Sequence, residues 1–111
     1  MSLEIAKLAI QAAQDKKASN IVVLDLNGRS DVCDYQFVCS GENEKQTVAI
    51  ADAIEAICRT EARCVPSAIE GKNSGHWISM DYGSLIVHVF VKSLRDYYAI
   101  ESIWPNAVMK L

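Results

Sequence analysis

Side chains that could act as acids, bases or metal ligands gather within residues 70–90; they are Glu70, His76, Asp81 and His88. The pattern there predicts two strands joined by a tight turn, and strand residues an odd number apart point to opposite faces. His76 and Asp81 therefore diverge. With the turn centred on Tyr82 and Gly83, His88 lies opposite Trp77, and the two imidazoles also occupy opposite faces. This geometry argues against a shared metal ion.

The cysteines offer a second kind of chemistry; they are Cys33, Cys39, Cys58 and Cys64. Their spacing lacks the C-x-x-C pairing typical of zinc and redox sites, and each lies among apolar residues, as a reduced structural thiol does. A nucleophile at Cys39 or Cys58 with His88 as its base remains conceivable, because such partners need only be close in space. No local signature supports that pairing.

A phosphate site is the third possibility, because Ser40 and Gly41 lie between a predicted strand and a helix N-terminus. Glu42 and Glu44 already place two carboxylates at that helix end, where they would repel a phosphate. The chain also contains neither glycine-rich phosphate-binding motif, G-x-G-x-x-G or G-x-x-x-x-G-K-[ST]. No cofactor is therefore expected.

The elements that must position these residues follow from periodicity and turn signals. We expect a first helix from about Ser2 to Lys16 and a second that begins after Asn43. Asn43 and Gln46 have the spacing of a capping-box variant, in which the side chain of the cap and that of the third helical residue each bond to the other's backbone. The remaining segments are strands at 20–26 and 34–40, a marginal strand at 65–71, a hairpin at 76–82 and 84–91, and short helices at 93–104. Gly83 supplies the positive φ of the hairpin turn.

This order, α-β-β-α-β-β-β-α, is neither a regular βαβ alternation nor all-β. It predicts a mixed α/β fold of the α+β kind, with about five strands in a mixed sheet and helices packed against it. At 111 residues, the chain is expected to form a single domain over 1–111.

Composition narrows the class of partner. The net charge is −3 and the lysines and arginines are scattered, so direct sequence-specific binding of nucleic acid is not expected. A mildly acidic protein suits a basic protein partner.

No apolar run is long enough to span a membrane, and residues 1–17 have the pattern of an amphipathic helix and not of a signal peptide. The cytoplasm is the expected location.

The hairpin has bulky residues on both faces. One face carries His76, Ile78, Met80 and Tyr82, and the other carries Trp77, Ser79 and Asp81. Across the turn, Leu85, Val87, Val89 and Val91 alternate with Ile86, His88 and Phe90. Either helices cover both faces, or Trp77 belongs to an exposed patch with Met80 or Tyr82 that anchors a partner. The sequence leaves both alternatives open.

Six segments in order carry a family resemblance that covers nearly the whole chain. They are SDVCDYQFVCSG (30–41), QTVAIAD (46–52), EG (70–71), WISMDYG (77–83), VHVF (87–90) and RDYYAIESIW (95–104). Each is weak alone, but together they resemble the Iojap family, the ribosomal silencing factors. The resemblance implies a fold related in topology to nucleotidyltransferases without their catalysis. It also implies a non-enzymatic factor that binds protein number fourteen of the large ribosomal subunit, blocks the small subunit and represses translation, and that often forms homodimers.

Departures from the family pattern occur at Gln36, Glu42 and Ser84, and those at 42 and 84 bear on contact details more than on the fold. The contact residues that we expect are Trp77, Met80, Asp81 and Tyr82, with Glu70, His88 and Glu101 as further members. The alternatives are a small nucleotidyltransferase-like or cysteine-dependent enzyme, and a scaffold that acts only through its dimer interface.

Overall fold

The computed structural model of the protein describes residues 2–28, 33–98 and 108. Its elements follow the predicted order: α1 (Ser2–Asp15), β1 (Ser19–Asp25), β2 (Tyr35–Gly41), α2 (Glu44–Ala62), β3 (Ala68–Glu70), β4 (Trp77–Asp81), β5 (Leu85–Val91) and α3 (Lys92–Tyr98). The expected mixed α/β fold is confirmed. Glu101 and the predicted helical residues after Tyr98 lie outside the described residues. No described helix is long and apolar enough to cross a membrane.

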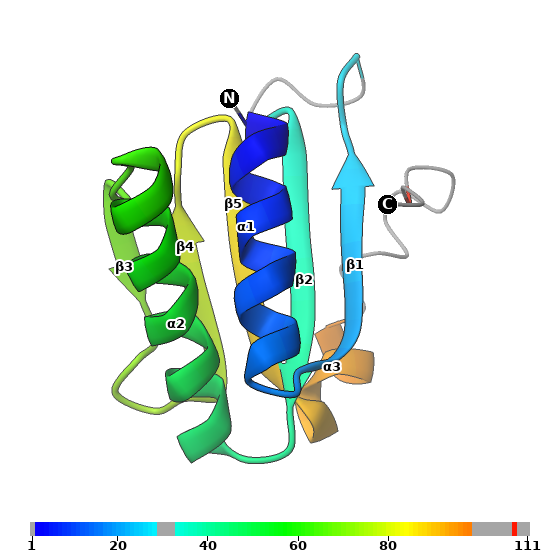
Figure 1. Cartoon of the computed structure of the whole chain (residues 1–111). Coiled ribbons are helices and arrows are strands. Elements are labelled where there is room, and N and C mark those ends of the chain that lie inside the picture. Colours follow the sequence, from blue (N-terminus) through cyan, green and yellow to red (C-terminus); the bar gives the residue numbers. More distant parts are fainter. Residues whose placement is uncertain (1, 29–32, 99–107, 109–111) are drawn as a thin grey trace.

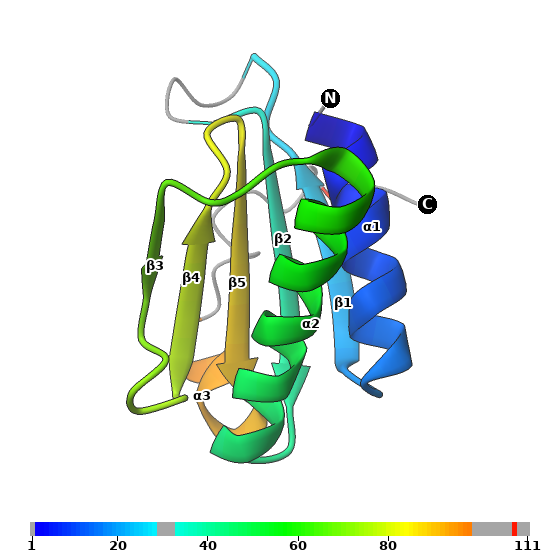
Figure 2. The same cartoon turned by 60° about the vertical axis from the view of Figure 1, so that its left-hand side comes forward.

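The strands form one five-stranded mixed sheet in the order β1-β2-β5-β4-β3 (Figure 1). Strands β2 and β5 run parallel, and the other three neighbouring pairs are antiparallel. Figure 2 shows β3 at one free edge of the sheet, beside β4. The central strand β5 is buried on both faces along nearly its whole length, which fits a sequence that is apolar except at His88.

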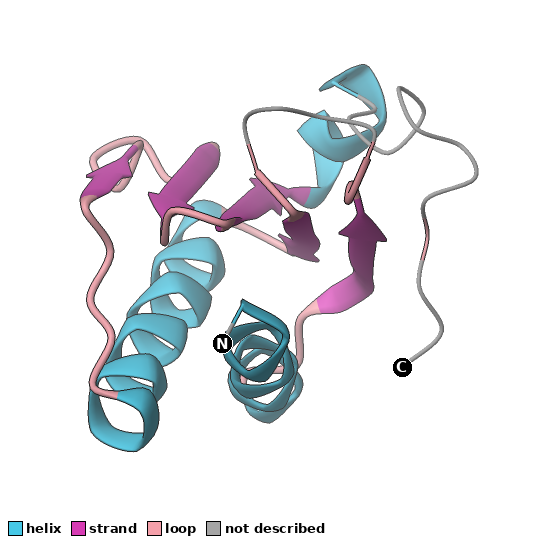
Figure 3. Ribbon diagram, turned by 90° about the horizontal axis from the view of Figure 1, so that it is seen from above, coloured by secondary structure: helices cyan, strands magenta, loops and turns pink. Residues whose placement is uncertain are grey.

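Helices α1 and α2 both cover the same face of the sheet, as the view along the strands shows (Figure 3). This face is the main hydrophobic core. Burying each large apolar side chain there stabilises the fold by roughly 1.5–3 kcal/mol. Its fully enclosed members include Phe37, Ile50, Ile54, Ile78, Met80, Val87 and Val89.

The start of α2 is capped much as predicted. The Asn43 side chain accepts a hydrogen bond from the Gln46 backbone N–H at 2.9 Å. The Gln46 side chain does not return to the Asn43 backbone; its Oε1 accepts from the N–H of Glu42, and its Nε2 donates to the carbonyl oxygens of Lys16 and Lys17. Gln46 thus joins the end of α1 to the start of α2, using backbone groups that helix termini leave unpaired.

The β4–β5 turn lies one residue further along the chain than predicted. The Tyr82 N–H donates to the Leu85 carbonyl at 2.9 Å, so the turn centres on Gly83 and Ser84 and not on Tyr82 and Gly83. Gly83 has the expected positive φ of 83°. Trp77 consequently pairs with Phe90, and His88 pairs with Ser79. A register shift of two residues preserves the faces, so the predicted division of the hairpin into two faces is confirmed.

Helix α3 is fastened to the end of the sheet by Arg95. This side chain is buried and its Nη1 donates to the Asn20 carbonyl at 2.7 Å and to the Ser40 hydroxyl oxygen at 2.9 Å. These contacts bring α3 against the adjacent strands β1 and β2.

Candidate partner-binding surface

The face of β3, β4 and β5 that α1 and α2 leave uncovered contains a shallow hollow of ≈ 260 Å³. We call this hollow the recess; it is lined by Ala68, Glu70, Trp77, Ser79, Asp81, Ile86 and His88. Small-molecule sites usually occupy roughly 300–1,000 Å³, so the recess is better suited to one or two protruding side chains of a partner.

The alternation of side chains along each strand places the residues of the recess on one face of the sheet. On β4, Trp77, Ser79 and Asp81 point to the uncovered face, whereas Ile78 and Met80 are fully buried beneath α1 and α2. On β5, Ile86 and His88 join the same uncovered face. The edge strand β3 closes one side with Ala68 and Glu70.

Trp77 belongs to an aromatic cluster with His88 and the fully buried Phe90, which lies beneath this surface. The Trp77 ring stacks on Phe90 with centroids 5.0 Å apart and an interplanar angle of 26°. Its indole N–H donates to Nδ1 of His88 at 3.0 Å. Trp77 is half-buried and lines the recess. A rigid, partly exposed indole is the kind of group that dominates protein interfaces.

His88 is a neutral part of this surface. Burial lowers the pKa of His88 to about 4, because the surrounding protein disfavours the charged imidazolium. Since the Trp77 indole can only donate, Nδ1 of His88 must be the unprotonated nitrogen, and the ring proton lies on Nε2. That Nε2 is buried and has no hydrogen-bond partner among the described residues. The uncharged ring leaves the negative charges beside it unneutralised.

Those negative charges are Glu70 and Asp81. Glu70 is exposed on β3, and its side chain forms no hydrogen bond or ion pair with the described residues. Asp81 is half-buried, and its Oδ1 accepts from the Gly83 N–H at 2.8 Å, which also fixes the turn. Among the described residues that line the recess, none carries a positive charge. The surface therefore combines an aromatic centre with an acidic edge.

The recess brings together Trp77, Asp81, Glu70 and His88 of the expected contact residues. Met80 was a wrong choice, because its side chain is completely buried on the opposite, helix-covered face. Tyr82 also packs on that face, beside Cys58 of α2, and burial raises the pKa of its phenol. Their exclusion follows from the odd spacing that separates them from Trp77 and Asp81.

Sequence reasoning left Ser79, Ile86 and Ala68 out of the expected set. Strand parity had already placed Ser79 with Trp77, and Ile86 with His88, so the signal for these two was present. Ala68 could be found only from its pairing with Asp81 across β3 and β4.

The cysteine-nucleophile hypothesis meets two obstacles. Burial raises the pKa of Cys39 to about 12 and that of Cys58 to about 11, so both are thiols and not reactive thiolates near neutral pH. Both also lie in the core on the helix-covered face, whereas His88 lies on the other face of the sheet.

The second histidine, His76, does not lie near His88 in the recess; its Nε2 is 3.6 Å from Oε2 of Glu44 on α2. Within the described residues, no group of three potential ligands could hold a metal.

The chain matches a known protein family over nearly its whole length. The profile of the family described as "Ribosomal silencing factor during starvation" matches residues 1–110. The chain belongs to this family. It is 36% identical over 104 residues to the Ribosomal silencing factor RsfS of Halalkalibacterium halodurans, covering 94% of this chain and 88% of that protein. It is 39% identical over 103 residues to the Bacillus subtilis protein of the same name, covering 93% and 86% of the two chains.

A solved structure of a Chromobacterium violaceum protein is similar over 100% of this chain and 92% of its own length, with a TM-score of 0.89 and 32% identity. The family membership inferred from six sequence segments is thereby confirmed, together with the fold. The Iojap resemblance had pointed to this same family of silencing factors.

Proposed function

We propose that this protein binds the large ribosomal subunit through ribosomal protein number fourteen, blocks association with the small subunit and so represses translation. Family membership supports the ribosomal role. The observation that carries the choice of surface is the recess, where the half-buried Trp77 lies beside Glu70 and Asp81 with no compensating positive charge among the described lining residues.

This arrangement has the anatomy of a protein interface. A central aromatic group that loses its remaining water contact contributes most of the affinity, and charges at the edge mainly guide encounter and orientation. Glu70 and Asp81 would meet basic side chains of the ribosomal protein. The repression itself requires no chemistry, because a bound protein on the joining surface excludes the small subunit by its volume. The role is therefore non-enzymatic, and it places the protein in the cytoplasm with the ribosomes.

A homodimer is part of the same proposal. The recess is a partly apolar surface that a second copy of the chain can also cover. If dimer and ribosome use the same residues, the two complexes compete, and only the monomer represses subunit joining.

The test is co-sedimentation with purified large subunits, followed by addition of small subunits. Glu70→Lys reverses a charge that no described residue pairs with, so the variant should fold normally and bind more weakly. The matched control is Glu61→Lys, the same charge reversal at an exposed position of α2 on the helix side of the molecule. We expect the control to bind and to block joining as the wild type does.

Three other outcomes would contradict parts of the proposal. If Glu70→Lys still co-sediments and blocks joining, the recess is not the contact surface. If the wild type does not bind the large subunit, the ribosomal role is wrong. If variants that stay monomeric lose repression while Glu70→Lys keeps it, the protein acts through its dimer interface instead.

A further inference from the structure

We propose that Lys72 is a positioning residue, which holds the β3 side of the recess in place for the partner. This inference rests on the proposed function of the recess. Strand β3 spans only Ala68–Glu70, lies at the edge of the sheet and pairs with β4 alone. It nevertheless supplies Ala68 and Glu70 to the recess. A three-residue edge strand has few contacts of its own, so it needs support from elsewhere.

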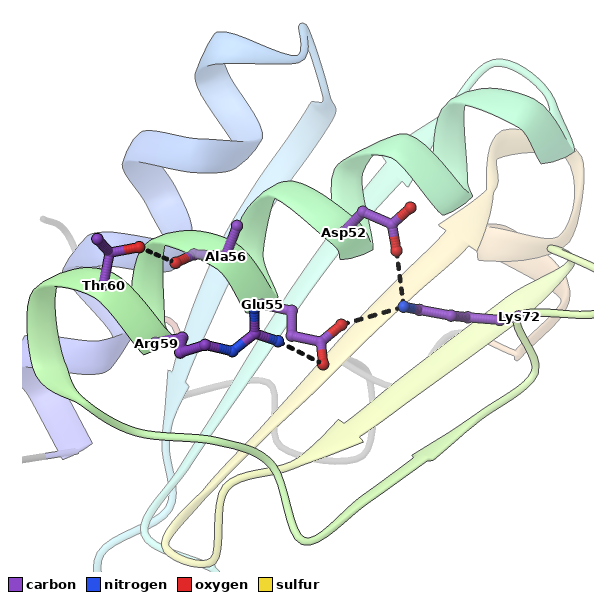
Figure 4. A network of polar contacts seen from close by, with 6 residues as sticks. All are labelled: Asp52, Glu55, Ala56, Arg59, Thr60 and Lys72. Carbon is purple, nitrogen blue, oxygen red and sulfur yellow. Dashed lines mark hydrogen bonds and ion pairs between the residues drawn. The ribbon is translucent and has the colours of Figure 1, made fainter.

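That support comes from α2, across the loop that follows β3. The Lys72 ammonium lies 2.6 Å from Oδ1 of Asp52 and 3.1 Å from Oε1 of Glu55, two carboxylates one helical turn apart (Figure 4). Glu55 is held in turn by Arg59 at 3.3 Å. The hydrogen bond to Asp52 is the main cause that raises the pKa of Lys72, so this side chain remains charged at physiological pH.

The position of Lys72 in the loop makes this contact effective. Only Gly71 separates it from Glu70, and Gly71 has a φ of 92° and packs so tightly that an added Cβ would overlap the Trp77 carbonyl oxygen. Further along, the Thr47 hydroxyl of α2 donates to the Gly75 carbonyl. The loop is thus fixed at its far end by a buried contact. Near Glu70, Lys72 provides the side-chain link to α2.

Loss of this link should let β3 separate from β4 more often. A partner binds only the form in which the recess is complete, so its apparent dissociation constant rises in proportion as that form becomes less populated. Losing two partly exposed ion pairs should change the ratio of complete to incomplete recess about fivefold, so the apparent dissociation constant rises by up to about fivefold. Lys72 lies on the helix side of the sheet edge, paired to α2, so the effect would be transmitted through β3 and not by contact with the partner.

The first measurement uses the free, full-length protein. Hydrogen exchange of the backbone amides at 68–76 should be faster in Lys72→Met than in the wild type, while exchange in β2 and β5 stays unchanged. Lys72→Arg keeps a charge that can bridge both carboxylates and should restore slow exchange. Lys45→Met is the matched control, because Lys45 is exposed in the first turn of α2 and forms no ion pair with the described residues. Unchanged exchange at 68–76 in Lys72→Met would overturn the inference without touching the proposed function.

The second measurement is affinity for purified large subunits. Lys72→Met should bind measurably more weakly, by up to about fivefold, and Lys72→Arg nearly as well as the wild type. In a Glu70→Ala background, the Lys72→Met change should have a smaller effect, because the side chain that it positions is gone. Equal losses in both backgrounds would show that Lys72 does not act through Glu70. A wild-type protein that fails to bind would refute the proposed function, a result separate from the exchange measurement.

Discussion

Replacing His88 by asparagine should remove a specific part of the pH dependence of stability. His88 is buried, and its pKa is lowered from the ordinary 6.5 to about 4. The unfolded chain therefore takes up a proton on this ring as the pH falls below about 6.5, whereas the folded protein does so only near pH 4. Stability from this residue is complete above pH 6.5 and is lost progressively as the pH falls towards 4.

The size of the effect follows from the two pKa values. Between about pH 7.5 and about pH 4.5, the difference in proton binding lowers the free energy of unfolding by about 2.5 kcal/mol. Asparagine cannot take up this proton, and its amide oxygen lies near the place of Nδ1, where it can still accept from the Trp77 indole. Carboxylates that titrate in the same interval contribute equally to both proteins and cancel in the comparison.

Urea unfolding of both proteins at the two pH values provides the measurement. The wild type should lose about 2.5 kcal/mol more than His88→Asn on acidification. Nitrogen NMR of the wild type near neutral pH should show the His88 proton on Nε2, with His76→Asn used to assign the two rings. Equal losses in both proteins would show that His88 is not held neutral by burial. A proton found on Nδ1 would refute the hydrogen bond from Trp77.

Three further substitutions test the fold around the recess. Met80→Ala deletes a fully buried side chain and should lower the free energy of unfolding in urea by about 2–5 kcal/mol, whereas a loss below about 1 kcal/mol would contradict its burial. Asn43→Ala removes the cap of α2 and should cost about 1 kcal/mol in a thermal melt, with Asn43→Asp as the variant that keeps an acceptor; equal melting of both variants would count against the cap. Gly71→Ala introduces a Cβ at positive φ against the Trp77 carbonyl and should destabilise by at least about 2 kcal/mol; a normal melt would rule out that backbone approach.

Local signals predicted much of the fold. The Asn43 side chain caps α2 as its spacing from Gln46 indicated, and Gly83 supplies the positive φ of the hairpin. These features depend on a few neighbouring residues, so they can be recognised without knowledge of the tertiary structure. The turn was misplaced because Asp81 caps the Gly83 N–H and shifts the closing hydrogen bond to Tyr82 and Leu85. That side-chain contact has no periodic signal.

The strand order could not be read from the sequence. The parallel pairing of β2 with β5 joins segments about fifty residues apart, from Tyr35 with Leu85 to Gly41 with Val91. Such a pairing depends on the packing of both helices on one face, which no single segment specifies. The same reason explains why Ala68 was missed, since it lines the recess only because β3 pairs with β4.

Met80 and Trp77 show why the site itself was predicted only in part. Both are large, apolar and three residues apart, and hydrophobicity alone does not tell which one the helices cover. Their neighbours do differ: Met80 shares its face with Ile78, Val87 and Val89, whereas Trp77 shares its own with Ser79, Asp81 and His88. A face that mixes an aromatic ring with hydrogen-bonding groups suits partial contact with water, because Trp and His each combine an apolar body with a polar atom. For a hairpin with two apolar faces, the chemistry of the residues beside each large side chain therefore discriminates better than its size, and here it selects the face of Trp77.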